Sequence, residues 1–159
     1  MRLRPLKLFV ASIVPLAIAT LVHGEAGDAQ PFDPATPVGH WKTVDDVTGK
    51  VNSLVDIREQ DGKLYSRIEK LINPDPNDPA PRCIRCQGDL KGKPLVGLQI
   101  LWGLKKNGDQ WTGGEILDPN SGKIYRCSIT VKEGGKKLRV RGFIGFSLLG
   151  RTEYWLRDA

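Results

Sequence analysis

Histidine is scarce in this chain, which has only His23 and His40 among its 159 residues, and His23 lies in an N-terminal stretch that we expect to be removed. A Ser-His-Asp triad needs a histidine beside its nucleophile, and a three-histidine zinc site needs more imidazoles than remain. Three cysteines are too few for a small disulfide-stapled protein, and no basic run is interleaved with aromatic residues. These shortages argue against triad hydrolysis, three-histidine zinc catalysis and nucleic-acid binding, and we expect no cofactor, no metal and no catalytic residues.

The N-terminal residues 1–24 have the pattern of a secretory signal peptide. The basic start consists of Arg2, Arg4 and Lys7. The apolar stretch 8–22 that follows is shorter than the roughly 20 residues of a membrane-spanning helix. Small residues offer cleavage sites after Gly24, Ala26 or Ala29. We therefore expect a periplasmic or secreted protein with no stable membrane span after cleavage.

Removal of residues 1–24 takes away three basic residues and no acidic ones, so the formal charge falls from +6 to +3. Residues 25–38 contain four proline or glycine residues and few large apolar ones. We interpret this segment as a flexible leader in front of a single β domain at 39–159.

Turn signals recur at hairpin spacing through that domain, because Gly and Asn tolerate the positive φ that tight hairpins require. We expect turns at 47–50, 60–63, 106–109, 119–122 and 133–136. Alternating apolar residues predict strands at 41–46, 51–59, 64–72, 95–105, 111–118, 124–132, 138–144 and 152–157. In 95–105 the alternation places Leu98, Ile100, Trp102 and Leu104 on one face.

The segment 73–94 interrupts this series, and its first nine residues include four prolines. Such a segment cannot be a central strand, and loops this long are usually functional or disordered. About eight antiparallel strands must bury one face and protect two edges, which closure into an up-and-down barrel achieves. The sequence therefore predicts an all-β, calycin-like barrel, with a two-sheet β-sandwich as the alternative.

The two ends of the domain resemble the calycin pattern. Gly39-His40-Trp41 opens the first expected strand, and Tyr154-Trp155-Leu156-Arg157 closes the last. In calycins a Gly-x-Trp packs beneath an arginine from the last strand. The resemblance implies that Gly39, Trp41 and Arg157 are structural residues, with the Arg157 guanidinium stacked on the Trp41 indole at the floor of the barrel.

A closer resemblance, spread over residues 39–158, is to the bacterial secreted family called domain of unknown function 2147. It rests on Gly39-x-Trp41 with Asp45-Asp46 and Gly49, Cys83-x-x-Cys86-x-Gly88, Asp118-Pro119 with Gly122-Lys123 and Tyr125, and Arg141-Gly142-x-Ile144-Gly145 with Leu149-Gly150-Arg151. The resemblance implies a secreted bacterial protein with one small β domain, and it implies no activity.

Cys83-Ile84-Arg85-Cys86 is the motif with most chemical potential. Flanking arginines would favour a thiolate, but a redox C-x-x-C normally begins a helix, and this one follows a proline-rich loop. A structural disulfide is the favoured interpretation, joining Cys83 to Cys86 or either of them to Cys127. Because Cys127 alternates with Ile129 and Val131 we expect it to be buried, which favours the Cys83–Cys86 pair. Redox activity, metal binding and free thiols remain alternatives.

Two further clusters carry polar chemistry. Asp45 and Asp46 end the first expected strand, where paired carboxylates either do acid/base work or bind turn amides. Arginines gather near the C-terminus, at 139, 141, 151 and 157, and form either an exposed strand face or an anion-holding pair. We take as candidate ligand-binding residues Tyr65, Trp102, Trp111, Arg139 and Arg141.

These features together favour a periplasmic protein that binds a small hydrophobic or anionic molecule inside a barrel. A structural or protein-interaction module of the bacterial envelope, with a solid core and no ligand, is the alternative. An enzyme is the least favoured interpretation.

Overall fold

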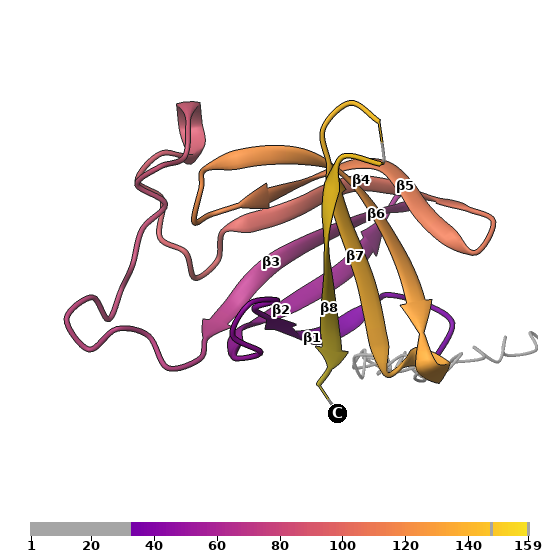
Figure 1. Ribbon diagram of the computed structural model, residues 1–159, viewed down its shortest axis with the longest axis horizontal. Coiled ribbons are helices and arrows are strands. Elements are labelled where there is room, and N and C mark those ends of the chain that lie inside the picture. The colour runs from indigo at the N-terminus through magenta and orange to yellow at the C-terminus, as the bar shows by residue number, and fades with distance from the viewer. Residues whose placement is uncertain (1–32, 147, 159) are drawn as a thin grey trace, which may run out of the picture. The chain divides into compact units, whose positions relative to one another are not determined.

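The computed structural model describes residues 33–146 and 148–158 (Figure 1). The predicted signal peptide and residues 25–32 of the predicted leader lie outside the described residues. The eight strands are β1 Gly39–Val44, β2 Val51–Gln60, β3 Lys63–Leu71, β4 Gln99–Asn107, β5 Gln110–Asp118, β6 Lys123–Lys132, β7 Lys137–Phe143 and β8 Gly150–Arg157. Two short 3-10 turns, η1 Gly88–Leu90 and η2 Glu133–Gly135, complete the described elements.

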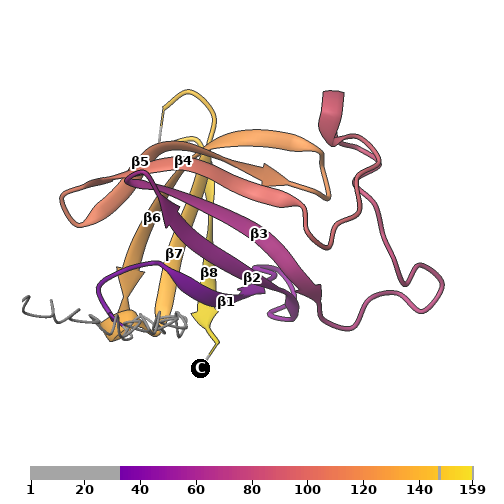
Figure 2. The ribbon, with the colours of Figure 1, turned by 180° about the vertical axis from the view of Figure 1, so that it is seen from behind.

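The strands form one closed barrel in chain order, each antiparallel to the next (Figures 1 and 2). Closure comes from pairing of β1 with β8, in which Trp41 lies opposite Arg157 and Lys42 opposite Leu156. The predicted all-β barrel is thereby confirmed, and the two-sheet alternative is not what the chain adopts.

Successive strands reverse direction, so the connections between strands fall at two ends of the barrel. The β2–β3, β4–β5 and β6–β7 turns share one end with the segment that leads into β1. The β2–β3 turn is a two-residue hairpin in which Asp61 has φ 51° and Gly62 has φ 69°. These positive φ values match the right-handed twist of the flanking strands, which is why Asp-Gly stands there.

The end that holds this segment is closed by a floor built around Trp41, whose side chain is fully buried. The guanidinium carbon of Arg157 lies 4.1 Å from the centroid of the Trp41 ring. The same guanidinium donates hydrogen bonds to the carbonyl oxygens of Val38 (3.0 Å), Thr36 (2.8 Å) and Gly135. One side chain therefore stacks on the indole and ties to it two backbone segments, the one before β1 and the β6–β7 turn.

Residues 33–38, expected to belong to a flexible leader, instead pack across this floor. Pro37 is buried, and its carbonyl oxygen accepts a hydrogen bond of 2.8 Å from Trp41 Nε1. A buried indole N–H needs an acceptor, and the segment before β1 supplies it. The proline content that indicated flexibility fits an extended strap equally well.

Gly39 must be glycine for two reasons. Its φ is 122°, in a region that L-residues rarely adopt, and a Cβ there would lie 3.0 Å from Arg157 Nη1. A side chain at position 39 would thus strain the backbone and displace the guanidinium from its place over Trp41.

Strand β4 departs from the predicted alternation because two register shifts interrupt its pairing with β3. Leu101 lies opposite Ser66 and Trp102 opposite Tyr65, so Ile100 and Gly103 are each left as an extra residue. Bulges of this kind move the following side chains to the other face of the sheet. The expectation that Trp102 shares a face with Ile100 and Leu104 was therefore wrong: Trp102 is half-exposed and Leu101 is buried in its place.

The long connection between β3 and β4 is fixed to the barrel by contacts with the β5–β6 turn. Cys83 and Cys86 are buried and form a disulfide. Arg85 Nη1 donates to the Asn120 carbonyl oxygen at 3.1 Å, and a Cβ on Gly122 would lie 2.0 Å from the Arg85 carbonyl oxygen. The disulfide thus shapes a segment that lies directly against this turn.

We expect replacement of Cys83 and Cys86 by serine to lower the free energy of unfolding by at most about 2 kcal/mol, because a ring this small removes little chain entropy from the unfolded state. Urea unfolding measures this difference.

Cys127 is buried, and burial raises the pKa of its thiol. Without reductant, no cysteine should therefore be alkylated in the native protein, and Cys127 should be alkylated after denaturation. Peptide mapping that finds Cys127 in a disulfide would contradict this assignment.

Candidate functional site

A cavity of about 420 Å³ occupies the end of the barrel opposite the Trp41 floor. All four connections at that end contribute to it: Asp45 from β1–β2, Leu95 from β3–β4, Asn120 from β5–β6, and Ile144 with Leu149 from β7–β8. The volume falls within the range of pockets that hold small organic molecules, roughly 300–1,000 Å³.

The interior of this cavity is mainly apolar. Inward residues of the strands line it, among them Ile68, Ile100, Ile116, Val140 and Trp155. Gly142 on β7 also lines the cavity, and a Cβ there would meet Tyr125 Cβ at 3.4 Å and Ile116 Cγ2 at 3.6 Å. These are ordinary contacts, so position 142 is a place where the chain leaves room inside the barrel.

Glu153 brings a carboxyl group into this apolar wall from β8. Trp155 Nε1 donates to its Oε2 at 3.3 Å, and Arg151 Nε lies 3.8 Å from its Oε1. Burial raises the pKa of Glu153 above its ordinary value, although the Trp155 bond and the Arg151 charge act in the opposite direction. Glu153 is therefore a polar group inside the cavity that takes up a proton more readily than an exposed carboxyl group.

This raised pKa gives a test. A carboxyl group whose pKa is higher folded than unfolded stabilises the fold below its unfolded pKa, and that contribution is lost as pH rises through the folded pKa. We expect Glu153→Gln to raise the melting temperature at pH values above the folded pKa of Glu153 and to change it little at acidic pH. Melting curves across pH check this, and a Glu153→Gln protein that is less stable than wild type at alkaline pH would contradict it.

The mouth of the cavity is acidic, with one paired cation. Arg151 binds the Asp46 carboxylate through Nε and Nη2, and this contact holds the pKa of Asp46 below its usual range. The Asp45 carboxylate accepts hydrogen bonds from the backbone and side chain of Thr48 and from the Val47 backbone, which lower its pKa. The two roles considered for this pair were acid/base work and binding of turn amides. Asp45 binds turn amides, and Asp46 instead forms an ion pair with Arg151.

None of the five candidate ligand-binding residues lines this cavity. Tyr65 and Trp102 form a cross-strand pair on the outer face, where Trp102 Nε1 donates to Glu115 Oε2 at 2.9 Å. Trp111 is buried near the β4–β5 turn at the floor end, with Lys106 Nζ 5.4 Å from its ring centroid.

Arg139 and Arg141 lie on the outer face of β7, because they alternate with the buried Leu138 and Val140. Arg141 donates to Thr152 Oγ1 at 2.9 Å and to the Leu148 carbonyl oxygen at 3.3 Å. The structure therefore brings Arg151, and neither of these two, to the cavity.

Glu153, Arg151 and Gly142 were not among the candidate ligand-binding residues, although the sequence carries a signal for them. Arg157 was expected to point inward, and a strand alternates with a period of two residues. The inner face of β8 must then carry Arg157 together with Trp155, Glu153 and Arg151. On β7, Gly142 lies on the same face as the buried Val140. Extending the alternation from Arg157 would have found them.

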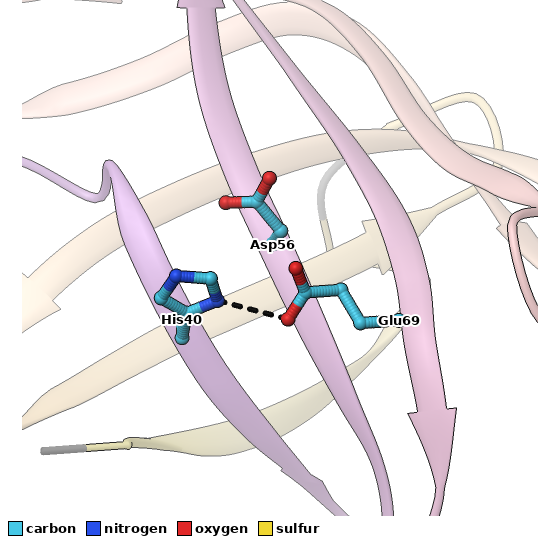
Figure 3. A group of neighbouring side chains, drawn as sticks. All are labelled: His40, Asp56 and Glu69. Carbon is cyan, nitrogen blue, oxygen red and sulfur yellow. Dashed lines mark hydrogen bonds and ion pairs between the residues drawn. The ribbon is translucent and has the colours of Figure 1, made fainter. Parts of the chain in front are cut away.

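A second cluster lies on the outer face of the barrel, where Figure 3 shows His40 of β1, Asp56 of β2 and Glu69 of β3 side by side. Glu69 is the extra residue of a bulge in the β2–β3 pairing. The three groups place ligand atoms within 4.8 Å of one another and could meet at a divalent metal. His40 Nδ1 already lies 2.9 Å from Glu69 Oε2, and Arg58 binds Asp56. We therefore interpret the cluster as a His40–Glu69 contact between β1 and β3 beside an Arg58–Asp56 ion pair within β2.

Among the described residues, no helix is both long and apolar enough to span a bilayer.

Comparisons with known proteins agree with this architecture. A protein from Helicobacter pylori that is described as belonging to the lipocalin family superimposes with a TM-score of 0.65 at 20% sequence identity, covering 77% of this chain and 82% of that one. No curated protein matches the chain significantly. The model of a bacterial family, described as an uncharacterized protein conserved in bacteria, matches residues 39–157. The chain therefore belongs to the DUF2147 family and folds as a lipocalin-like barrel.

Proposed function

We propose that this protein is exported and binds a small apolar or amphipathic molecule in the barrel cavity. The observation that carries the proposal is the open cavity of about 420 Å³ with an apolar wall. The buried disulfide supports export, because such bonds persist in oxidising compartments. The lipocalin-like architecture supports ligand binding, since eight-stranded barrels have room for one small ligand.

The charges at the mouth bear on the polar end of the ligand. Asp45, Asp118 and Glu153 line the cavity, and Arg151 among the lining residues is paired with Asp46. An anionic head group would meet three carboxyl groups and one neutralised guanidinium. We therefore propose an uncharged or cationic head group in place of the anionic one considered from the sequence.

The proposal is tested by titration with an uncharged, environment-sensitive dye such as N-phenylnaphthylamine. Gly142→Leu fills the cavity, and we expect it to weaken dye binding at least about tenfold, which corresponds to about 1.4 kcal/mol. Ser128→Leu adds the same side chain to β6 at a position that pairs with Arg141 on the outer face, and it should bind as wild type does. Dodecylamine and dodecanol should displace the dye more effectively than dodecanoate.

Two results would contradict the proposal. If wild type binds neither the dye nor the dodecyl compounds, the alternative of a structural module without a ligand is favoured. If Gly142→Leu folds and binds the dye as well as wild type does, the dye occupies another site. A Gly142→Val variant, with a smaller side chain, covers the case in which Gly142→Leu fails to fold.

A further inference from the structure

Large exposed apolar side chains concentrate at the mouth of the cavity. Ten such side chains are exposed in the described part of the chain, and seven of them lie in connections at the mouth. We call these seven the apolar rim: Val47, Ile84, Val96, Ile144, Phe146, Leu148 and Leu149. The most exposed are Leu148 at 89%, Val47 at 85% and Phe146 at 82%. A large apolar surface left open to water normally marks an interaction site.

The opposite end of the barrel has no such feature among its described residues. The β2–β3, β4–β5 and β6–β7 turns are built from Gly, Asp, Asn, Lys and Glu, and none of them exposes a large apolar side chain. The asymmetry therefore belongs to the mouth, and it is not a general property of the loops of this barrel.

The β7–β8 loop presents its apolar side chains from a held conformation. The Leu149 backbone N–H donates to the Phe146 carbonyl oxygen at 3.1 Å, and the Ile144 N–H donates to the Leu149 carbonyl oxygen at 3.2 Å. Arg141 Nη2 reaches the Leu148 carbonyl oxygen at 3.3 Å. The described residues of this loop, 144–146 and 148–149, are therefore tied by hydrogen bonds while Phe146 and Leu148 remain exposed.

The carboxyl groups of Asp45, Asp118 and Glu153 line the cavity, whereas the segment of the rim that carries Ile84 lies outside that lining and is basic. Segment 82–93, which carries Ile84, has four cations (Arg82, Arg85, Lys91 and Lys93) and one anion (Asp89). The β7–β8 loop, residues 144–149, has no charged residue. Apolar tips beside basic side chains are the combination that binds the surface of an anionic lipid bilayer.

We propose that the apolar rim docks the mouth of the barrel onto an anionic lipid bilayer. The tips lie on three separate connections, so a bilayer can receive each of them independently, whereas a protein partner needs a matching contiguous surface. Ile144 and Leu149 belong both to the rim and to the cavity wall, which makes the apolar surface continuous from outside to inside. Docking goes beyond ligand binding and places the mouth where an amphipathic molecule is dissolved.

The experiment is co-sedimentation of the mature protein with phosphatidylcholine vesicles that contain or lack phosphatidylglycerol. Wild type should bind the vesicles that contain phosphatidylglycerol and bind less as salt is raised. Phe146→Ser combined with Leu148→Ser should lower the partition coefficient about a hundredfold, since burial of each large apolar side chain contributes about tenfold. Leu156→Ser removes an exposed apolar side chain of β8 near the floor and should bind as wild type does.

Dye titration separates this proposal from the function of the cavity. The Phe146→Ser, Leu148→Ser protein should still bind the dye, and Gly142→Leu should still bind vesicles. Docking is overturned if wild type fails to bind anionic vesicles, as it would if the rim served a protein partner. It is also overturned if the double rim variant binds vesicles as tightly as Leu156→Ser does. If wild type binds anionic vesicles but does not bind the dye, the function proposed for the cavity is overturned and docking is not.

Discussion

Truncation of Trp41 to alanine is expected to lower the free energy of unfolding by about 3–5 kcal/mol, a large part of the stability of a small domain. The indole is fully buried at the barrel floor, and its Nε1 binds the Pro37 carbonyl oxygen. Arg157→Ala should lower it by about 1–2 kcal/mol, because the stacking is lost and three carbonyl oxygens lose their donor. Urea unfolding of both single variants measures these effects.

The double variant tests whether the two residues act together. Side chains in contact should give a coupling free energy of at least about 0.5 kcal/mol, whereas additivity within about 0.3 kcal/mol would show that they do not support each other. Arg58→Ala is a suitable control, because that side chain is 79% exposed and its loss should change stability by less than about 0.5 kcal/mol.

Gly122→Ala is expected to lower the free energy of unfolding by about 2–4 kcal/mol, the combined effect of positive φ and overpacking. Gly122 has φ 71°, and a Cβ there would lie 2.0 Å from the Arg85 carbonyl oxygen and 2.8 Å from the Cys86 nitrogen. The β5–β6 turn and the disulfide segment can approach this closely because position 122 lacks a side chain. Thermal and urea unfolding provide the measurement.

Gly108→Ala separates the two causes. Gly108 has φ 63°, and a Cβ there would meet nothing within 4 Å, so it reports the backbone strain alone. Equal losses at positions 108 and 122 would show that the contact with the disulfide segment contributes nothing. Gly122→Ala should also be less destabilising when Cys83 and Cys86 are serine, since the segment can then move away.

The barrel was predictable because its signals are local. Turn residues such as Asp61-Gly62 and alternation such as Leu138-Arg139-Val140 each fix a hairpin or a face without distant information. The Trp41–Arg157 pairing followed from the resemblance to calycins, and closure of the sheet places these two residues opposite each other.

The candidate site was less predictable, because its residues depend on contacts that alternation does not encode. Two bulges in β4, at Ile100 and Gly103, turn Trp102 to the outer face. A glycine marks the second bulge in the sequence, but no special residue marks the first. Trp111 does point inward, but it lies at the floor end of the barrel, away from the cavity. Alternation along a strand shows which face a residue is on but does not show its position along the barrel axis. Glu153 was within reach of the period-two argument, but its type indicated an exposed residue.

Native mass spectrometry of the protein purified from the cells that produce it shows directly whether the cavity holds a small molecule. We expect wild type to carry one non-covalent small molecule that denaturation releases, and we expect Gly142→Leu to lack it. A wild-type protein with the mass of the polypeptide alone, or a Gly142→Leu protein that carries the same molecule, would contradict this expectation.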